Sequence, residues 1–178
     1  MTAMILDDLS REGGETALGT RWALVSDGVM GGVSTGTLER EVVDGRMALR
    51  LRGAVRLENN GGFLQMAVDL APAGGVLNAR GWDGLRMSIW GNGAEYGVHL
   101  RTPDLARPWK SFRAQVQSGP DWQVVDLPFA AFVPHRTETA LDISRLRRLG
   151  ILAIGRAFQA DVALGGLHLY RAGDEAHD

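Results

Sequence analysis

Hydrophobic and polar residues alternate with a period of two along several short segments of the chain. The clearest segment is 47–58, where the apolar positions 47, 49, 51, 55 and 57 share one parity and arginines occupy positions 50, 52 and 56. Such alternation predicts a pleated strand with one apolar and one polar face. Gly53 within the segment predicts a bend or a bulge. The residues Asn-Asn-Gly-Gly at 59–62 tolerate positive φ and predict a turn after the strand.

The same pattern recurs further along the chain. We expect strands over residues 63–70, 85–90, 96–101, 112–117 and 122–127 and around Leu167 and Leu169. Residues 149–154 form a nearly continuous apolar run, which is typical of a central strand covered on both faces. Helical signal is confined to possible single turns at 128–132 and 144–148. The pattern therefore predicts an all-β fold, an antiparallel β-sandwich of jelly-roll type.

Length and composition narrow the class of protein. With 178 residues, we expect a single domain over 1–178, with a core of about 20–171, a short N-terminal extension up to about Gly14 and a disordered C-terminal tail after Arg171. The net charge of -2 gives no cationic field that would favour nucleic acid. The absence of cysteine excludes disulfides, thiolate catalysis and cysteine-based zinc sites. We see no signal peptide and no apolar run long enough for a membrane span, so we expect a cytoplasmic protein.

The glycine-rich stretch 26–36 contains the pattern G-x-S-x-G, which presents a nucleophilic serine in many hydrolases. Asp161 and His168 follow Ser34 in the chain order of an α/β hydrolase. That fold needs alternating strands and helices, which this chain does not predict, so a serine hydrolase using Ser34 is a remote alternative. We expect no catalytic residues and no enzyme activity.

Metal and phosphate sites have little support in the sequence. The glycine-rich stretch lacks the lysine of a Walker loop, and the four histidines are too dispersed for metal-ligand spacing. A structural calcium ion held by Asp7, Asp8 and Asp27 is an open alternative to solvated loop acids. We therefore expect no cofactor and assign no metal ligand.

The polar faces of the predicted strands are the better candidates for binding. If the strands around positions 86, 99 and 113 are neighbours, their outward side chains form one surface. The members of this surface are Arg86, Ser88, Trp90, His99, Arg101, Arg113, Gln115 and Gln117. Arginine and tryptophan together suit sugar hydroxyls, an acidic peptide or a partner protein. The alternative is a solvated outer sheet face.

Several motifs resemble those of one protein family. Trp22 followed by Asp27-Gly28-Val29-Met30-Gly31-Gly32-Val33-Ser34, then Asn60-Gly61-Gly62-Phe63 and Gly91-Asn92-Gly93 with Tyr96, are similar to the signature of the complex I intermediate-associated protein 30 family. The resemblance extends from about Trp22 to Tyr170. This chain has Asn92 where the family has an aspartate in that turn.

The resemblance implies a galactose-binding-like β-sandwich and a role in biogenesis, because the eukaryotic relatives are assembly factors for respiratory complex I. We therefore expect a protein-binding assembly factor or chaperone-like adaptor, with respiratory-complex subunits or assembly intermediates as possible partners. A small-ligand or carbohydrate-binding module is the alternative. The motif residues added to the candidate binding set are Trp22, Asp27, Met30, Ser34, Asn60 and Tyr96.

Overall fold

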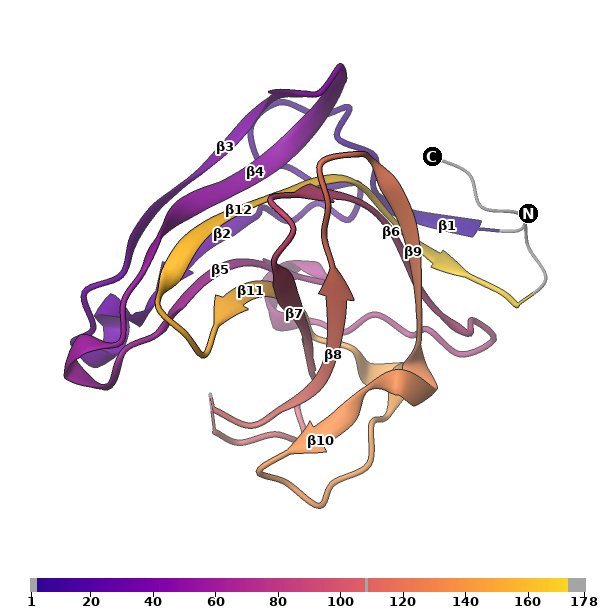
Figure 1. The fold of residues 1–178 in the computed structure, drawn as a ribbon. Coiled ribbons are helices and arrows are strands. Elements are labelled where there is room, and N and C mark those ends of the chain that lie inside the picture. The colour runs from indigo at the N-terminus through magenta and orange to yellow at the C-terminus, as the bar shows by residue number, and fades with distance from the viewer. Residues whose placement is uncertain (1–2, 108, 173–178) are drawn as a thin grey trace.

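The structure, a computed structural model, describes residues 3–107 and 109–172 as two six-stranded antiparallel sheets packed face to face (Figure 1). Sheet I has the order β3 (Thr35–Val43), β4 (Arg46–Val55), β12 (Phe158–Tyr170), β6 (Gly84–Gly91) and β9 (Gln123–Pro128), and β1 (Ala3–Asp7) also pairs with β12. Sheet II has the order β10 (Val133–His135), β8 (Ser111–Gln117), β7 (Glu95–Arg101), β11 (Arg148–Ile154), β5 (Phe63–Asp69) and β2 (Ala23–Ser26). The predicted all-β sandwich of jelly-roll type is confirmed.

Helical structure in the described residues is limited to short 3-10 turns. These are η1 (Asp27–Met30), η2 (Glu58–Asn60), η3 (Pro72–Gly74), η4 (Phe129–Ala131) and η5 (Ile143–Arg145). The last two lie at the turns predicted from 128–132 and 144–148. No helix within the described part of the chain has the length and apolar character needed to cross a membrane.

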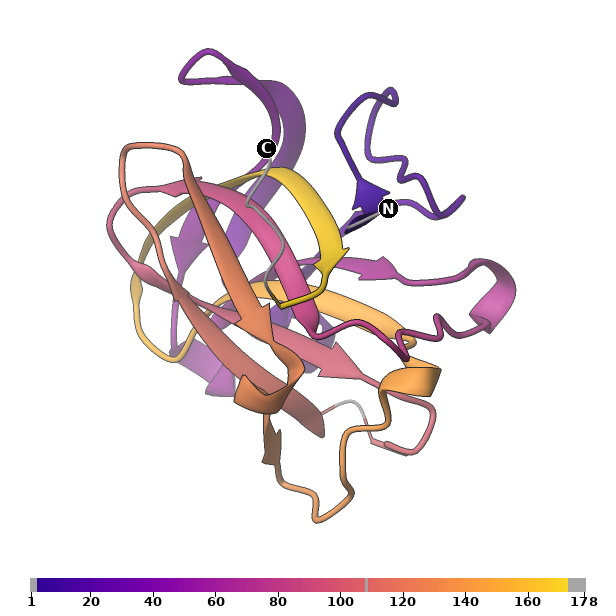
Figure 2. The same cartoon turned by 90° about the vertical axis from the view of Figure 1, so that its right-hand side faces the viewer.

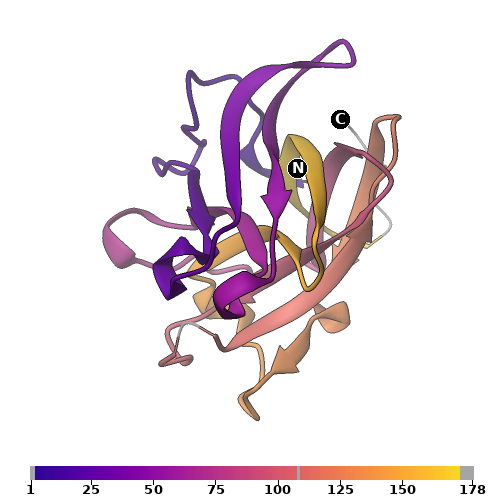
Figure 3. The same ribbon diagram turned by 60° about the vertical axis from the view of Figure 1, so that its left-hand side comes forward.

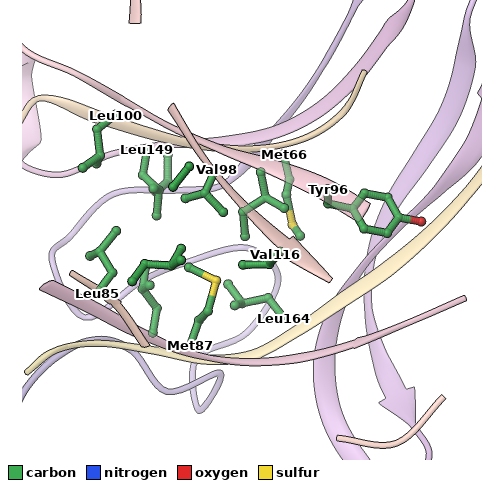
Figure 4. Close-up of a cluster of buried hydrophobic side chains, with 14 of the residues drawn as sticks. Met66, Leu85, Met87, Tyr96, Val98, Leu100, Val116, Leu149 and Leu164 are labelled. Atoms are coloured by element: carbon green, nitrogen blue, oxygen red, sulfur yellow. The ribbon is translucent and has the colours of Figure 1, made fainter. Parts of the chain in front are cut away.

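The core lies between the two sheets and is built by strand parity. Side chains of Met66, Val98 and Leu149 from sheet II face Met87 and Leu164 from sheet I (Figure 4). All are fully buried or nearly so, and burial of one such side chain contributes about 1.5–3 kcal/mol. The predicted alternation is confirmed as far as Val55, because the leucines at 49 and 51 enter this core while the arginines at 50 and 52 point outward. Strand β4 ends there, and Leu57, expected on the apolar face, is 48% exposed.

Residues expected in an N-terminal extension form part of sheet I. Strand β1 pairs with the end of β12, with Met4 opposite Leu169 (Figure 1). Leu6 and Leu9 are buried in the core, at 1% and 5% exposure. The expected tail after Arg171 lies, from residue 173 onward, outside the described residues.

Gly53 is needed for a close approach of two strands. Strand β4 runs through this position in regular register with β3 and β12, so the bulge that the sequence offered as one possibility is absent. Gly53 lies opposite Gly36, and a Cβ at position 53 would overlap the carbonyl oxygen of Thr35. Figure 3 brings this β3–β4 pair forward. The glycines therefore keep the hairpin closely packed rather than ending it.

Two loops lie at the lower edge of the sandwich. The loop after β10, in orange, projects there beside the loop that joins β7 to β8 (Figure 2). Lys110 of the second loop and Arg136 of the first line the same small hollow. These loops border one end of the outer face of sheet II.

Candidate functional site

The buried carboxylate of Asp27 joins the glycine-rich loop before β3 to the turn before β5. Its Oδ2 accepts hydrogen bonds from the backbone N–H of Gly62 (2.6 Å) and Phe63 (3.3 Å) and from the hydroxyl of Ser34 (2.6 Å). Its Oδ1 accepts the backbone N–H of Ser34 (3.0 Å). The two motifs of the family resemblance are therefore one hydrogen-bonded unit.

Glycine is required around this carboxylate because there is no room for side chains. A Cβ at Gly32 or at Gly61 would lie 2.5 Å from carboxylate atoms of Asp27. Burial raises the pKa of Asp27, but the hydrogen bonds from Ser34, Gly62 and Phe63 outweigh it and hold the pKa below its usual value. The carboxylate is therefore charged at neutral pH and acts as a fixed acceptor.

Ser34 is part of this unit and is 6% exposed. Its hydroxyl donates to Asp27 and accepts the backbone N–H of Arg56 at 2.9 Å. Asp161, which follows it in the hydrolase pattern, is held instead by two hydrogen bonds from Arg50 at 2.8 and 2.7 Å. In this arrangement Ser34 links two loops, and its hydroxyl is not presented as a nucleophile.

A groove of about 1030 Å³ runs over the outer face of sheet II. One end is apolar and the other is rich in nitrogen donors. The apolar end is lined by Val25, Val29, Met30, Phe63, Leu152 and Ile154. The polar end is lined mainly by His99, Arg101, Trp109, Arg113, Arg147 and Arg148.

The floor of the groove is hollow because small residues lie at its centre. Gly150 of β11 stands opposite Ala67 on one side and His99 on the other. The side chain of Gln65 folds over Gly150, so that a Cβ there would overlap its amide. Strand β11 is central in its sheet, as predicted, and its residues 149–153 are buried. On the outer face Gly150 and Leu152 form the floor of the groove, and the exposed Ile154 borders it.

Arg101 fixes the loop that borders the polar end. Its guanidinium donates to the carbonyl oxygens of Leu105 (3.1 Å), Arg107 (2.7 Å) and Lys110. The loop carries Trp109, whose side chain lines the groove and is 53% exposed. Arg101 therefore holds an aromatic ring at the edge of the groove.

Electrostatics at the polar end is dominated by positive charge. Burial, with smaller contributions from Arg113 and His135, lowers the pKa of His99 to about 3. The imidazole is therefore neutral at physiological pH, and it can both donate and accept a hydrogen bond. Burial also lowers the pKa of Arg101, and the nearby Arg148 and Arg147 lower it further.

The structure divides the predicted binding surface between two faces. His99, Arg101 and Arg113 lie together in the groove, and Gln115 is exposed on the same sheet face, opposite Gly97. Met30 lies at the other end of the groove and is 59% exposed. The expectation that the strand of Arg86 and Trp90 neighbours these strands is wrong, because β6 belongs to sheet I.

On sheet I, Arg86 and Trp90 already have partners within the protein. Arg86 is 4% exposed, forms a salt bridge with Asp126 (2.6 Å) and lies over the ring of Tyr170. The Trp90 ring lies under the guanidinium of Arg50, 5.0 Å from its centroid. These contacts stabilise the outer face of sheet I.

Three further candidate residues have structural contacts. Trp22 is buried and donates its indole N–H to Asp7 at 2.8 Å. Tyr96 lies in the core, and its hydroxyl donates to Asn92 at 2.7 Å. Asn60 is exposed in the turn that leads to Gly62, with φ 59°.

Sequence reasoning missed several groove residues, chiefly Gln65, Asp69, Trp109, Arg147 and Arg148. For Gln65, Asp69 and Arg148 the missed signal was strand parity, since residues of odd number in β5 and of even number in β11 point away from the core. Trp109 and Arg147 lie in loops, where parity gives no signal. Within residues 3–107 and 109–172 no group of three or more His, Cys, Asp or Glu could hold a metal ion. Asp8 instead accepts hydrogen bonds from Ser10 on the surface.

We predict that Asp27→Asn lowers the free energy of unfolding by about 3 kcal/mol, because an amide nitrogen cannot accept the hydrogen bonds that the carboxylate oxygen accepts. The matched control Asp8→Asn, at a surface carboxylate, should cost less than about 1 kcal/mol. Urea unfolding of both variants measures the difference. Equal losses would contradict the role assigned to Asp27.

We predict that His99 makes stability depend on pH below 6.5. The unfolded state takes up a proton near the ordinary pKa of 6.5, whereas the folded state does so only near 3. Stability is therefore fully present above pH 6.5 and falls as the pH drops from 6.5 towards 3, by at most about 1.4 kcal/mol per pH unit. The slope between pH 6 and 4.5 should be smaller in His99→Gln, and an NMR titration showing His99 protonated at pH 6 would contradict this.

Several proteins of known structure have a fold similar to that of this chain. A family 11 carbohydrate-binding module from Clostridium thermocellum, in complex with a β-1,3-1,4-mixed-linked tetrasaccharide, is similar with a TM-score of 0.74 at 11% identity over 97% of both chains. A family 30 carbohydrate-binding module of a Clostridium thermocellum cellulosomal cellulase is similar with a TM-score of 0.58 at 16% identity, over 79% of this chain and 84% of that one. An agarase is similar with a TM-score of 0.66 at 10% identity, over 100% of this chain and 25% of the agarase. At these identities the likeness shows a shared fold.

No curated protein matches the sequence. The family described as Complex I intermediate-associated protein 30 (CIA30) matches residues 14–164, which include both loops joined by Asp27 and most of the two sheets. The chain belongs to the complex I intermediate-associated protein 30 family.

Proposed function

We propose that this chain is a non-catalytic binding domain that holds a segment of a partner protein in the groove of sheet II. The observation that carries the proposal is the groove itself, which joins an exposed apolar end to an arginine-rich end. Val29 and Met30 are 77% and 59% exposed at the apolar end, and Trp109 is 53% exposed at the other. Exposed apolar and aromatic side chains with arginine are the residue types that dominate protein recognition.

Family membership supports the role of an assembly factor or chaperone-like adaptor, with respiratory-complex subunits or assembly intermediates as partners. The contacts of Ser34 support a domain without a catalytic serine. A groove that binds an exposed segment of an unassembled subunit would keep that segment from other contacts until the next subunit arrives.

A photo-crosslinking amino acid placed at Ile154, in the groove, should capture such a partner in native cells. The same amino acid at Val42, which is 62% exposed on edge strand β3 of sheet I, is the matched control. Mass spectrometry should identify a respiratory subunit or assembly intermediate at position 154, and Met30→Asp should reduce its yield at least fivefold. The absence of any protein captured specifically from position 154 would refute the proposal.

A carbohydrate ligand is the second candidate. It is favoured by the exposed indole of Trp109 at the groove edge, because aromatic rings stack on sugar faces, and by the shared fold with a module solved with a tetrasaccharide. Under this candidate, calorimetry with mixed-linked glucan oligosaccharides should give heat that is lost in Trp109→Ala. If the unaltered chain gives no heat, the carbohydrate candidate is rejected and the protein-binding proposal remains.

A further inference from the structure

Three of the four arginines that line the groove lack acidic partners in the described residues. Four arginines and one aspartate line it, and Asp69 forms its salt bridge with Arg148 at 2.8 Å. Arg101, Arg113 and Arg147 form no salt bridge with any residue of the described ranges. The polar end of the groove therefore carries an uncompensated positive charge.

Arg101 and Arg113 are also partly removed from water, whereas Arg147 is exposed. Burial lowers the pKa of Arg113, and the charge of Arg136 lowers it further. Burial and the nearby charges of Arg148 and Arg147 likewise lower the pKa of Arg101. Cations that are desolvated beside one another favour binding of an anion, because the anion supplies the missing attraction without new reorganisation of the site.

The outer face of sheet I shows that this is a local feature and not a result of arginine-rich composition. There Arg50 forms salt bridges with Glu41 (3.0 Å) and Asp161 (2.7 Å), and Arg52 approaches Glu41 at 3.5 Å. Arg86, on the same face, pairs with Asp126 at 2.6 Å, whereas three of the four arginines that line the groove have no carboxylate partner in the described residues. Charge complementarity therefore requires that the acidic groups come from the ligand.

The geometry of β11 sets the length of the ligand. Arg148 borders the cationic end and Ile154 the apolar end of the same strand. Six residue steps along a strand span about 20 Å, which is also the length of about six residues of extended peptide. The neutral imidazole of His99 and the side-chain amide of Gln65, which lies over Gly150, stand between the ends, and both groups can hydrogen-bond a peptide backbone.

We propose that the groove binds an extended acidic segment of the partner protein, with carboxylates at Arg101, Arg113 and Arg147 and apolar side chains against Met30 and Phe63. This inference rests on the proposed function and names the chemistry of its ligand. A nucleic acid fits less well, because the apolar end offers no charge to a continuing row of phosphates.

A library of random ten-residue peptides displayed on phage, selected on the full chain, tests the inference. Selected peptides should carry Asp or Glu in one half and apolar residues in the other. Their Kd should rise at least tenfold in Arg113→Gln/Arg147→Gln and by less than threefold in the control Arg21→Gln/Arg52→Gln, which removes two charges outside the groove. Arg147→Gln alone changes an exposed side chain and should still weaken binding if the double variant is unstable.

The possible outcomes separate the two proposals. Two results would overturn the inference and leave the proposed function standing. The first is selected peptides whose binding is lost in Met30→Asp but which carry no acidic residues. The second is selected peptides that bind the arginine variants with unchanged Kd. The absence of any groove-dependent peptide would reject peptide binding itself, and both proposals with it. Bound acidic peptides should also raise the pKa of His99, which NMR measures independently of affinity.

Discussion

The buried carboxylate of Asp27 is the interaction on which the site depends. It fixes the glycine-rich loop before β3 against the start of β5 through two hydrogen bonds, from the N–H groups of Gly62 and Phe63, and accepts two more from Ser34 within the loop. The same loop carries Val29 and Met30, and β5 begins with Phe63, so one carboxylate aligns the apolar end of the groove. Gly32 and Gly61 leave the space that the carboxylate needs, and Gly31 and Gly62 supply the positive φ of the two turns around it.

The two outer faces of the sandwich differ in how their charges are compensated. On sheet I, arginine lies with carboxylates and aromatic rings of the same chain, so that little binding energy remains for a ligand. On sheet II, Arg148 pairs with Asp69, but Arg101 donates to backbone carbonyls and Arg113 to a serine hydroxyl, and the charges of these two arginines stay uncompensated. Composition alone gives no sign of this difference, since both faces use the same residue types.

Local features of the fold could be predicted from the sequence, and features set by strand order could not. Alternation in 47–58 correctly separated the inward leucines from the outward arginines, because parity is a property of one strand. Strands β6 and β7 are consecutive in the chain but lie in different sheets, which placed Arg86 and His99 on opposite faces. The apolar run of β11 could not distinguish a covered face from a groove, because that depends on loops distant in sequence, such as the one held by Arg101.

The pairing of strand β12 affects how sheet I folds during synthesis of the chain. The thirteen residues of β12 pair with β4, β6 and β1. Neither the β3–β4 hairpin nor β1 can therefore join sheet I before β12 is in place. Contacts between Met4 and Leu169 give the topology a high contact order, which slows folding. At synthesis rates of about 5–20 residues per second, sheet I remains open on the ribosome until the C-terminal strand emerges. During this interval the edges of β4 and β6 that β12 will cover are unpaired, and unpaired strand edges are prone to pair with other chains.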